Sequence, residues 1–180
     1  ACGSYGGSNA LLELFDGRQR GMATHSMAGH DGTGLVMAAK VGAALTRTSY
    51  ETFIEPLPYG FPYMSQYEGC IMVDASAQRF VNEDLPMFSD LGMAMQLKMT
   101  EEGSDHISVI ANLTDSVQEA IDYGFEVFVE NTPEELAGKL GLDAAALAQT
   151  IASYNAMIAA GEDTDFGRTD YVAELTAPFC

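Results

Sequence analysis

Positively charged residues are scarce in this chain. Its 180 residues include 8 lysines and arginines against 26 aspartates and glutamates, which gives a formal net charge of −18. Such an acidic chain repels phosphate backbones and anionic lipid headgroups, so nucleic acids and membrane surfaces are the least expected partners. Long apolar runs are also missing, because no stretch approaches the roughly 18 residues that a membrane-spanning helix needs. We therefore expect no direct membrane insertion.

Cysteine and the common catalytic motifs are also scarce or missing. The three cysteines are an odd number and form no C-x-x-C pair, so they predict neither a disulfide framework nor a metal centre. His25 and His30 lie five residues apart with Asp31 adjacent, but no third or fourth ligand follows at a suitable distance. The sequence also lacks a P-loop, a dinucleotide-binding G-x-G-x-x-G and a Ser-His-Asp arrangement. It predicts no metal site and leaves the location open between cytoplasm and export.

The composition that remains is typical of a chain with a packed core. Hydrophobic residues make up 47% of the chain and charged residues only 19%. A length of about 100–200 residues is usual for one domain. The first residues resemble the end of a buried strand that enters a glycine turn, and the last four residues are apolar. We therefore interpret the chain as a segment excised from a longer protein.

Helical and strand patterns alternate along the chain. Apolar periodicity and capping residues predict helices over residues 9–15, 35–45, 89–99, 133–140 and 143–160. Strands are expected over residues 70–73, 79–81, 107–111 and 125–129, the first two joined as a hairpin by the turn at 74–78. The predicted fold class is α+β, with a small mixed or antiparallel sheet packed against helices.

Three groups of residues could carry chemistry, and each has a structural alternative. The glycine-rich stretch 29–34 precedes a helix, where free N–H groups favour an anion or a cofactor phosphate, but a plain turn and helix cap produces the same pattern. Arg79 could bind a substrate carboxylate, or it could pair with Glu83 and hold the following loop. Tyr63 and Tyr67 lie in a loop rich in proline and aromatic residues. They could supply a phenol as a proton donor in a pocket, or they could be core aromatics.

Six short motifs follow one another in a fixed order along nearly the whole chain. They are segments 1–12, 31–45, 74–83, 134–147, 154–168 and 177–179, which resemble in turn the family patterns A-T-G-G-F, T-G-D-G-x-x-M-A-x-x-A-G-A, N-x-x-G-x-R-F-V-N-E, E-E-L-A-x-x-x-G-x-D-x-x-x-L, Y-N-x(5)-G-x-D-x-D-F-G-R and A-P-F-Y. Each motif is weak alone, but six in the same order are specific. Together they resemble the flavoprotein family of fumarate reductase, succinate dehydrogenase and soluble flavocytochrome c.

The resemblance implies a division of the chain. In that family the corresponding stretch is the capping, or catalytic, domain, which is inserted into an FAD-binding domain and closes over the flavin to form the substrate cleft. Residues 1–30 would then end the FAD-binding domain and form a hinge. Residues 31–176 would form the capping domain, and residues 177–180 would return toward the FAD-binding domain.

The resemblance also implies a cofactor and partners. The cofactor is FAD, contacted by Gly32, Thr33 and Gly34. Because the family's nucleotide-binding motif precedes this segment, we do not expect the chain to hold FAD by itself. The implied partners are its own FAD-binding domain, a small-molecule substrate, and an electron-donor protein or haem domain.

The residues with which this family binds fumarate are replaced here. Glu55 stands where the family has the histidine of H-P-T, Met87 stands where it has a catalytic arginine, and the T-E-x-x-R proton relay is absent. A thioether can neither pair with a dicarboxylate nor donate a proton. We therefore expect an FAD-dependent reductase or dehydrogenase that moves hydride between flavin and a C–C substrate other than fumarate. Its expected catalytic residues are Tyr63 and Tyr67, and its expected substrate contacts are Glu55 and Met87. The alternative is a non-catalytic interaction or structural domain with a decayed site.

Overall fold

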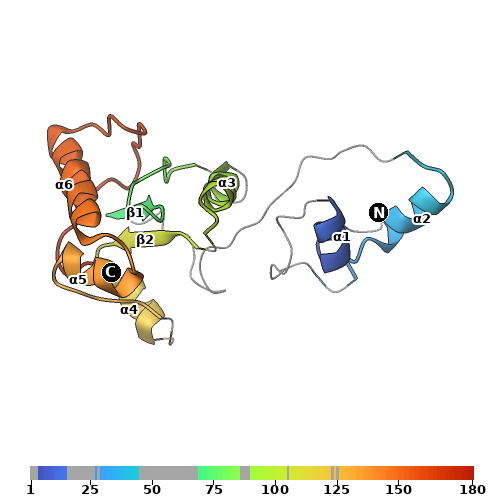
Figure 1. Ribbon diagram of the computed structural model, residues 1–180, viewed down its shortest axis with the longest axis horizontal. Helices are drawn as coiled ribbons and strands as arrows, with labels where there is room; N and C mark the ends of the chain where they lie inside the picture. The colour runs from blue at the N-terminus through green and yellow to red at the C-terminus, as the bar shows by residue number, and fades with distance from the viewer. Residues whose placement is uncertain are drawn as a thin grey trace. The chain divides into compact units, whose positions relative to one another are not determined.

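The computed structural model describes residues 4–15, 27, 29–44, 69–85, 90–104, 106–122, 124 and 126–180 (Figure 1). The chain forms two compact units, Ala1–Tyr50 and Glu51–Cys180. Two helices are described in the first unit; four helices and both strands are described in the second.

The first helix of unit 1, α1, spans Asn9–Phe15, as the sequence predicts. The hydroxyl oxygen of Ser8 accepts a hydrogen bond from the Leu11 N–H at 3.4 Å, which satisfies one of the free donors at the start of the helix. At the other end the ring of Phe15 lies 5.2 Å from that of Tyr5. These contacts bind the helix to the turn that precedes it.

The second helix of unit 1, α2, spans Thr33–Lys40 and is shorter than the predicted range of 35–45. It ends early because Gly42 takes a φ of 86°, a left-handed conformation in which a helix cannot continue. The N–H of Ala43 then bonds to the carbonyl of Ala38, a common way of closing a helix at a glycine.

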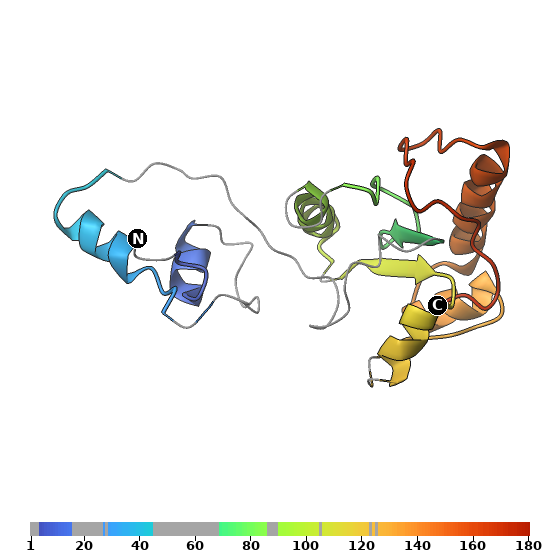
Figure 2. The same cartoon turned by 180° about the vertical axis from the view of Figure 1, so that it is seen from behind.

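Unit 2 contains an antiparallel two-stranded sheet, seen from both sides in Figures 1 and 2. Strand β1 spans Cys70–Val73 and strand β2 spans Ser108–Ala111, with Cys70 opposite Ala111. The end of the chain extends the pairing, because Cys180 and Ala111 exchange two backbone hydrogen bonds of 2.9 and 2.7 Å. Every residue of β1 is buried, so β1 belongs to the core of unit 2.

Four helices accompany this sheet. They are α3 (Gly92–Glu102), α4 (Asp115–Asp122), α5 (Pro133–Leu140) and α6 (Ala144–Ala160). The prediction of α5 and α6 is confirmed together with their caps. Thr132 accepts a hydrogen bond from the Glu135 N–H at 3.2 Å, and Asp143 accepts one from the Ala146 N–H at 2.8 Å. Helix α3 lies three residues further along than its predicted range of 89–99, and Gly103 ends it with a φ of 65°.

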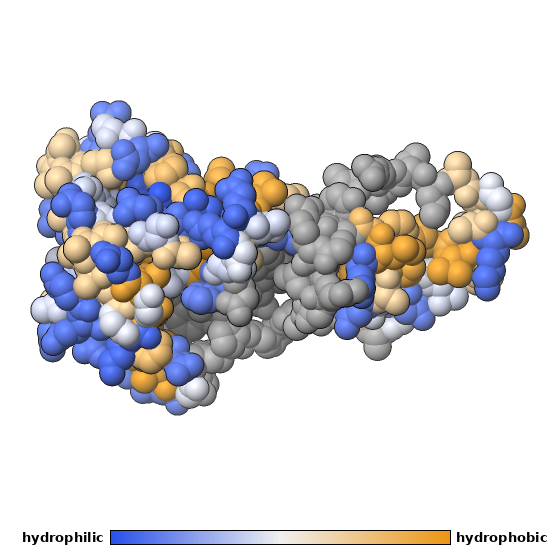
Figure 3. Space-filling view, in the orientation of Figure 1, coloured by the Kyte–Doolittle hydropathy of each residue, from blue (hydrophilic) through white to orange (hydrophobic). Residues whose placement is uncertain are grey.

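The core of unit 2 forms where α5 and α6 pack against the sheet. Its buried members include Ile71, Ile110, Leu136, Leu147 and Tyr154. On the face that Figure 3 shows, hydrophilic residues cover much of this unit. Apolar side chains are more exposed in unit 1, where Leu14, Met37 and Val41 are 73%, 63% and 86% accessible.

Two of the predicted strands are wrong. After the turn, which Asp74 closes by accepting hydrogen bonds from the N–H groups of Ser76 and Gln78, only one bridge forms, between Val73 and Arg79. Residues 80–85 form no further bridge with β1, whose strand partner is β2. The predicted strand at 125–129 is also absent over its described residues 126–129, because pairing there is limited to Glu130 and the end of the chain.

The coarse fold class is α+β, as predicted, with an antiparallel sheet and packed helices. Helix α4 is the one described element that the sequence did not predict. Among the described residues, no helix is both long and apolar enough to cross a membrane.

Candidate functional site

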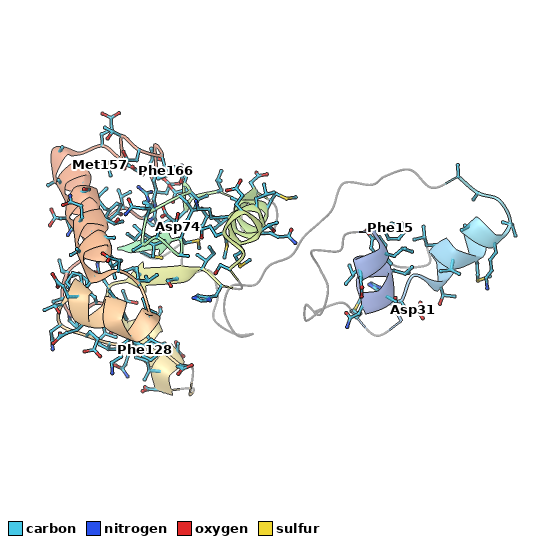
Figure 4. All side chains as sticks on the ribbon, viewed as in Figure 1. Phe15, Asp31, Asp74, Phe128, Met157 and Phe166 are labelled. Atoms are coloured by element: carbon cyan, nitrogen blue, oxygen red, sulfur yellow. The ribbon has the colours of Figure 1, made fainter. Side chains whose placement is uncertain are left out.

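The predicted cofactor segment Gly32, Thr33 and Gly34 lies at the start of α2. Gly32 caps the helix with a φ of 75°. The Thr33 N–H donates to the Asp31 carboxylate at 2.9 Å, and hydrogen bonds from the backbone and side chain of Thr33 hold the pKa of Asp31 below its ordinary value. Asp31 is labelled beside this helix in Figure 4. The start of α2 therefore already carries a carboxylate, which complements the positive end of the helix dipole.

These residues do not fit the diphosphate of FAD. A diphosphate at this position would lie beside the ionised Asp31, and like charges repel. Gly32 is explained by packing within the chain, because a Cβ there would lie 2.3 Å from Leu11 Cδ1 and 2.8 Å from Tyr5 Cβ. The role of Gly32, Thr33 and Gly34 in binding the cofactor stays a prediction.

Five charged residues, which we call the buried charge cluster, join residues 79–84 to the loop that follows α6. They are Arg79, Glu83, Asp84, Asp163 and Arg168. Arg79 Nη2 lies 2.6 Å from Glu83 Oε2 and 2.7 Å from Asp163 Oδ2. Arg168 Nε lies 2.9 Å from Asp84 Oδ1. The side chains of Glu83, Asp163 and Arg168 are fully inaccessible, so these pairs are shielded from solvent.

The cluster is bonded directly to the sheet. The N–H of Met72 in β1 donates to Glu83 Oε1 at 3.0 Å. Arg168 Nη1 donates to the carbonyl of Cys70 in the same strand. Removing either side chain would leave a buried backbone group of β1 without its partner, which makes the cluster part of the core.

Arg79 is enclosed on all sides. Its guanidinium carbon lies 5.2 Å from the ring centroid of Tyr154 and 4.9 Å from that of Phe166, whose loop after α6 is labelled in Figure 4. Its Nε and Nη2 donate to Glu83. The interpretation of Arg79 as the partner of Glu83 is confirmed, while its Nη1 is buried and has no hydrogen-bond partner among the described residues.

Acid is expected to weaken the cluster through Asp163. Burial disfavours its charge, but the hydrogen bonds and charge of Arg79, with the N–H groups of Phe166 and Arg168, outweigh burial and hold the pKa of Asp163 below 3.8. A depressed pKa in the folded chain means that this stabilisation is complete above about pH 4 and is lost as the pH falls further. Urea unfolding measured at pH 7 and at pH 3 gives the decrease in the free energy of unfolding between the two pH values. We expect this decrease to be smaller for Asp163→Asn than for the wild type. Equal losses in the two proteins would contradict the assignment.

The two lysines of unit 2 are also paired with carboxylates. Lys98 Nζ lies 3.0 Å from Asp74 Oδ2, and Lys139 Nζ lies 3.8 Å from Glu130 Oε1. The two arginines of this unit belong to the buried charge cluster, and residues 51–180 contain no other lysine or arginine. Every lysine and arginine of unit 2 therefore has a carboxylate of its own chain as partner.

Four predicted site residues, Glu55, Tyr63, Tyr67 and Met87, lie outside the described residues. The structure therefore does not test the roles predicted for them. In the described part of the chain, no three or more His, Cys, Asp and Glu side chains gather where they could hold a metal ion.

The sequence did not predict two further members of the buried charge cluster, Asp163 and Arg168. Asp163 and Arg168 lie about eighty residues further along the chain, and the sequence pattern gave them no role. One sequence feature could have indicated them: charged residues occur beside apolar residues within two family motifs, R-F-V-N-E and D-x-D-F-G-R. Each motif supplies the charges that neutralise the other.

Comparison with known proteins agrees with this fold. The 3-ketosteroid-delta4-(5alpha)-dehydrogenase from Rhodococcus jostii RHA1, solved in complex with 4-androstene-3,17-dione, superimposes with a TM-score of 0.70 at 26% identity, over 99% of this chain and 36% of its own. The fumarate reductase (cytochrome) of Shewanella frigidimarina is 30% identical over 178 residues, which are 93% of this chain and 30% of that protein.

A third relative is similar over a shorter range. The 4-oxocyclohex-2-ene-1-carboxylate 5-dehydrogenase of Sinomonas cyclohexanicum is 37% identical over 119 residues, which are 57% of this chain and 20% of that protein. The chain thus spans roughly a third of the length of its relatives, or less. The family model described as the FAD binding domain matches residues 1–179. The chain therefore belongs to the FAD binding domain family, and FAD is the cofactor of the full-length protein.

Proposed function

We propose that this chain is the capping segment of an FAD-dependent oxidoreductase, and that it shapes the substrate site over the cofactor. Residues 31–176 form the capping domain, with residues 1–30 and 177–180 linking it to the FAD-binding domain. The family match over residues 1–179 and the short span of the chain within its relatives support this organisation. The cofactor is then bound by the longer protein and not by this segment alone.

The substrate that we propose is a neutral or monoanionic ketone with a C–C bond beside the carbonyl, not fumarate. One observation carries this proposal: every lysine and arginine of residues 51–180 is already paired with a carboxylate. A dicarboxylate needs cationic partners, because an unpaired charge is expensive to bury. Glu55 adds a negative charge, which disfavours a dicarboxylate further.

The names of two relatives support the same substrate class. One acts on 4-oxocyclohex-2-ene-1-carboxylate, a monoanionic ring ketone, and the other is a ketosteroid dehydrogenase. Both names describe ring ketones. We propose that Met87 provides an apolar wall for such a ring.

The chemistry divides between cofactor and protein. FAD, when bound, supplies the hydride-transfer capacity. The phenol of Tyr63 or Tyr67 exchanges a proton with the substrate, and Glu55 and Met87 contact its body. An electron-donor protein or a haem domain completes the redox cycle in this proposal.

The proposal is tested with the full-length protein, purified with its flavin and reduced without oxygen. Reoxidation of the flavin is then followed by absorbance after addition of 4-androstene-3,17-dione, 4-oxocyclohex-2-ene-1-carboxylate or fumarate. We expect at least one ketone to reoxidise the flavin, and fumarate to act about 10²–10³-fold more slowly, the usual effect of losing one charge-stabilising group.

Two results would contradict this proposal. Fumarate turnover as fast as ketone turnover would overturn the substrate class. A protein whose flavin reacts with none of these compounds would favour the alternative, a non-catalytic domain with a decayed site.

A further inference from the structure

We propose that residues 174–180 are a rigid part of the capping domain, so that this segment does not serve as a hinge toward the FAD-binding domain. The inference rests on the proposed function, in which this chain caps a cofactor held by the longer protein. It refines the boundary given there, which counts residues 177–180 as a link. It starts from the bonds that join the segment to three other parts of unit 2.

The first of these bonds comes from helix α6. Asn155 Nδ2 donates to the Leu175 carbonyl at 2.8 Å, and Asn155 Oδ1 accepts from the Leu175 N–H at 2.8 Å. The side-chain amide thereby takes the place that a residue of a neighbouring antiparallel strand would have. The Leu175 side chain is 2% accessible and packs in the core with Leu147 and Ile151. Leu175 is therefore fixed to α6 by its backbone and by its side chain.

The second set of bonds comes from Asn112, the residue that directly follows β2. Its Nδ2 donates to the Glu174 carbonyl at 2.9 Å, and its Oδ1 accepts from the Thr176 N–H at 2.8 Å. Gly69 makes room for this amide, because a Cβ at position 69 would lie 1.9 Å from Asn112 Nδ2. Two asparagines from distant parts of the sequence therefore hold three consecutive residues of the segment.

The last two residues of the segment lie between two partners. Phe179 exchanges backbone hydrogen bonds of 2.8 and 2.9 Å with Glu130, and Cys180 exchanges bonds of 2.9 and 2.7 Å with Ala111. Figures 1 and 2 both show the end of the chain beside β2. Successive residues of an extended strand bond to opposite sides, so Phe179 and Cys180 do not form an exposed edge. Releasing them would break the pairs on both sides.

These contacts do not suit a hinge. Hinge residues absorb changes in their backbone torsions, which requires a backbone that few other groups hold. Residues 174–176 and 179–180 each have a backbone group bonded outside the segment. Residues 177 and 178 lie between these fixed points, so a change in their torsions cannot swing the chain that follows Cys180. Any movement of the FAD-binding domain would therefore act on α6 and β2 together.

The experiment is hydrogen exchange of the full-length protein, measured with and without 4-androstene-3,17-dione as the probe. We expect the amides of residues 175, 176, 179 and 180 to exchange at least about 100-fold more slowly than in an unstructured peptide of the same sequence, because each donates a hydrogen bond. The rates should be the same in both conditions. Exchange less than about 10-fold slower than in the peptide, or rates that change when the steroid is added, would overturn the inference.

Asn155→Asp tests the bond from α6. The carboxylate of aspartate can accept from the Leu175 N–H but cannot donate to the Leu175 carbonyl, which then loses its partner. We expect exchange at residues 174–176 to become about 10-fold faster or more. Asn131→Asp is the matched control, because it makes the same chemical change at an exposed asparagine of the same unit, and its exchange at these residues should equal that of the wild type. Equal exchange in the two variants would contradict the role of Asn155.

The outcomes separate this inference from the proposed function. The wild-type exchange rates decide whether the segment is rigid even if Asn155→Asp does not fold. They do so without any turnover, so a protein that reacts with none of the probes contradicts the proposed function while slow exchange at residues 174–180 still supports a rigid segment. Fast exchange there in a protein that turns over a ketone would keep the proposed function and overturn the inference.

Discussion

Replacing Arg79 with methionine is expected to lower the free energy of unfolding of the chain by about 3–5 kcal/mol. The substitution removes the partner of two buried carboxylates, because Arg79 Nη2 lies 2.6 Å from Glu83 and 2.7 Å from Asp163. Both carboxylates have fully inaccessible side chains, so water cannot replace the lost guanidinium. Methionine has a similar length and can still pack between Tyr154 and Phe166, so the loss reflects charge more than volume.

The measurement is urea unfolding of the 180-residue chain, followed by circular dichroism at pH 7. Lys139→Met is the matched control, because it also exchanges a paired cation for methionine, but Lys139 is 55% accessible and its pair with Glu130 is long, at 3.8 Å. An exposed pair of this kind contributes about 0–1 kcal/mol. An Arg79→Met effect no larger than that of Lys139→Met would show that the buried charge cluster does not contribute to stability as argued.

The best-predicted part of the fold was the part that local chemistry decides. Thr132 and Glu135 stand three residues apart, the spacing at which a threonine can cap a helix, and the structure forms that cap. Asp143 and Gly161 likewise mark the two ends of α6. Because each signal lies within a few residues of its effect, no knowledge of the rest of the chain is needed to interpret it.

The partner of β1 could not be predicted in the same way. Turn residues after Val73 favour a hairpin, and the turn does form, but β1 pairs with β2, which begins at Ser108. Arg79 forms a single bridge to Val73 and an ion pair with Asp163, which lies far along the chain. Local propensity therefore predicted the turn correctly and the strand after it wrongly.

In the candidate site, too, the contacts between residues close in sequence could be predicted and the distant ones could not. The pairing of Arg79 with Glu83 could be predicted because the two opposite charges lie only four residues apart in sequence. The ion pair between Arg168 and Asp84 could not be predicted, because two residues 84 positions apart in sequence leave no local pattern. The roles of the substrate-facing residues came from family resemblance, since no composition or periodicity distinguishes a catalytic tyrosine from a core tyrosine.

Replacing the proton-donating tyrosine with phenylalanine is expected to lower turnover of the ketone substrate by about 10²–10⁴-fold, the usual contribution of general acid–base catalysis. Tyr63 and Tyr67 are the two candidates, and phenylalanine removes only the hydroxyl group from either. A phenol with a pKa near 10 is protonated at neutral pH and can donate to the substrate carbon beside the carbonyl. We expect the large loss in one of the two variants and a smaller effect in the other. The assay is kcat of the full-length protein with each ketone probe.

Tyr171→Phe is the matched control, because Tyr171 is a 53% accessible tyrosine of the described chain and has no proposed role in the site. The flavin spectrum of each variant should equal that of the wild type, since none of the three hydroxyls is proposed to hold the cofactor. A loss in kcat with an unchanged spectrum then assigns the effect to the proton and not to folding. Full activity in both Tyr63→Phe and Tyr67→Phe would remove the two tyrosines from the mechanism. The proton donor would then be another group, because the thioether at position 87 cannot donate a proton.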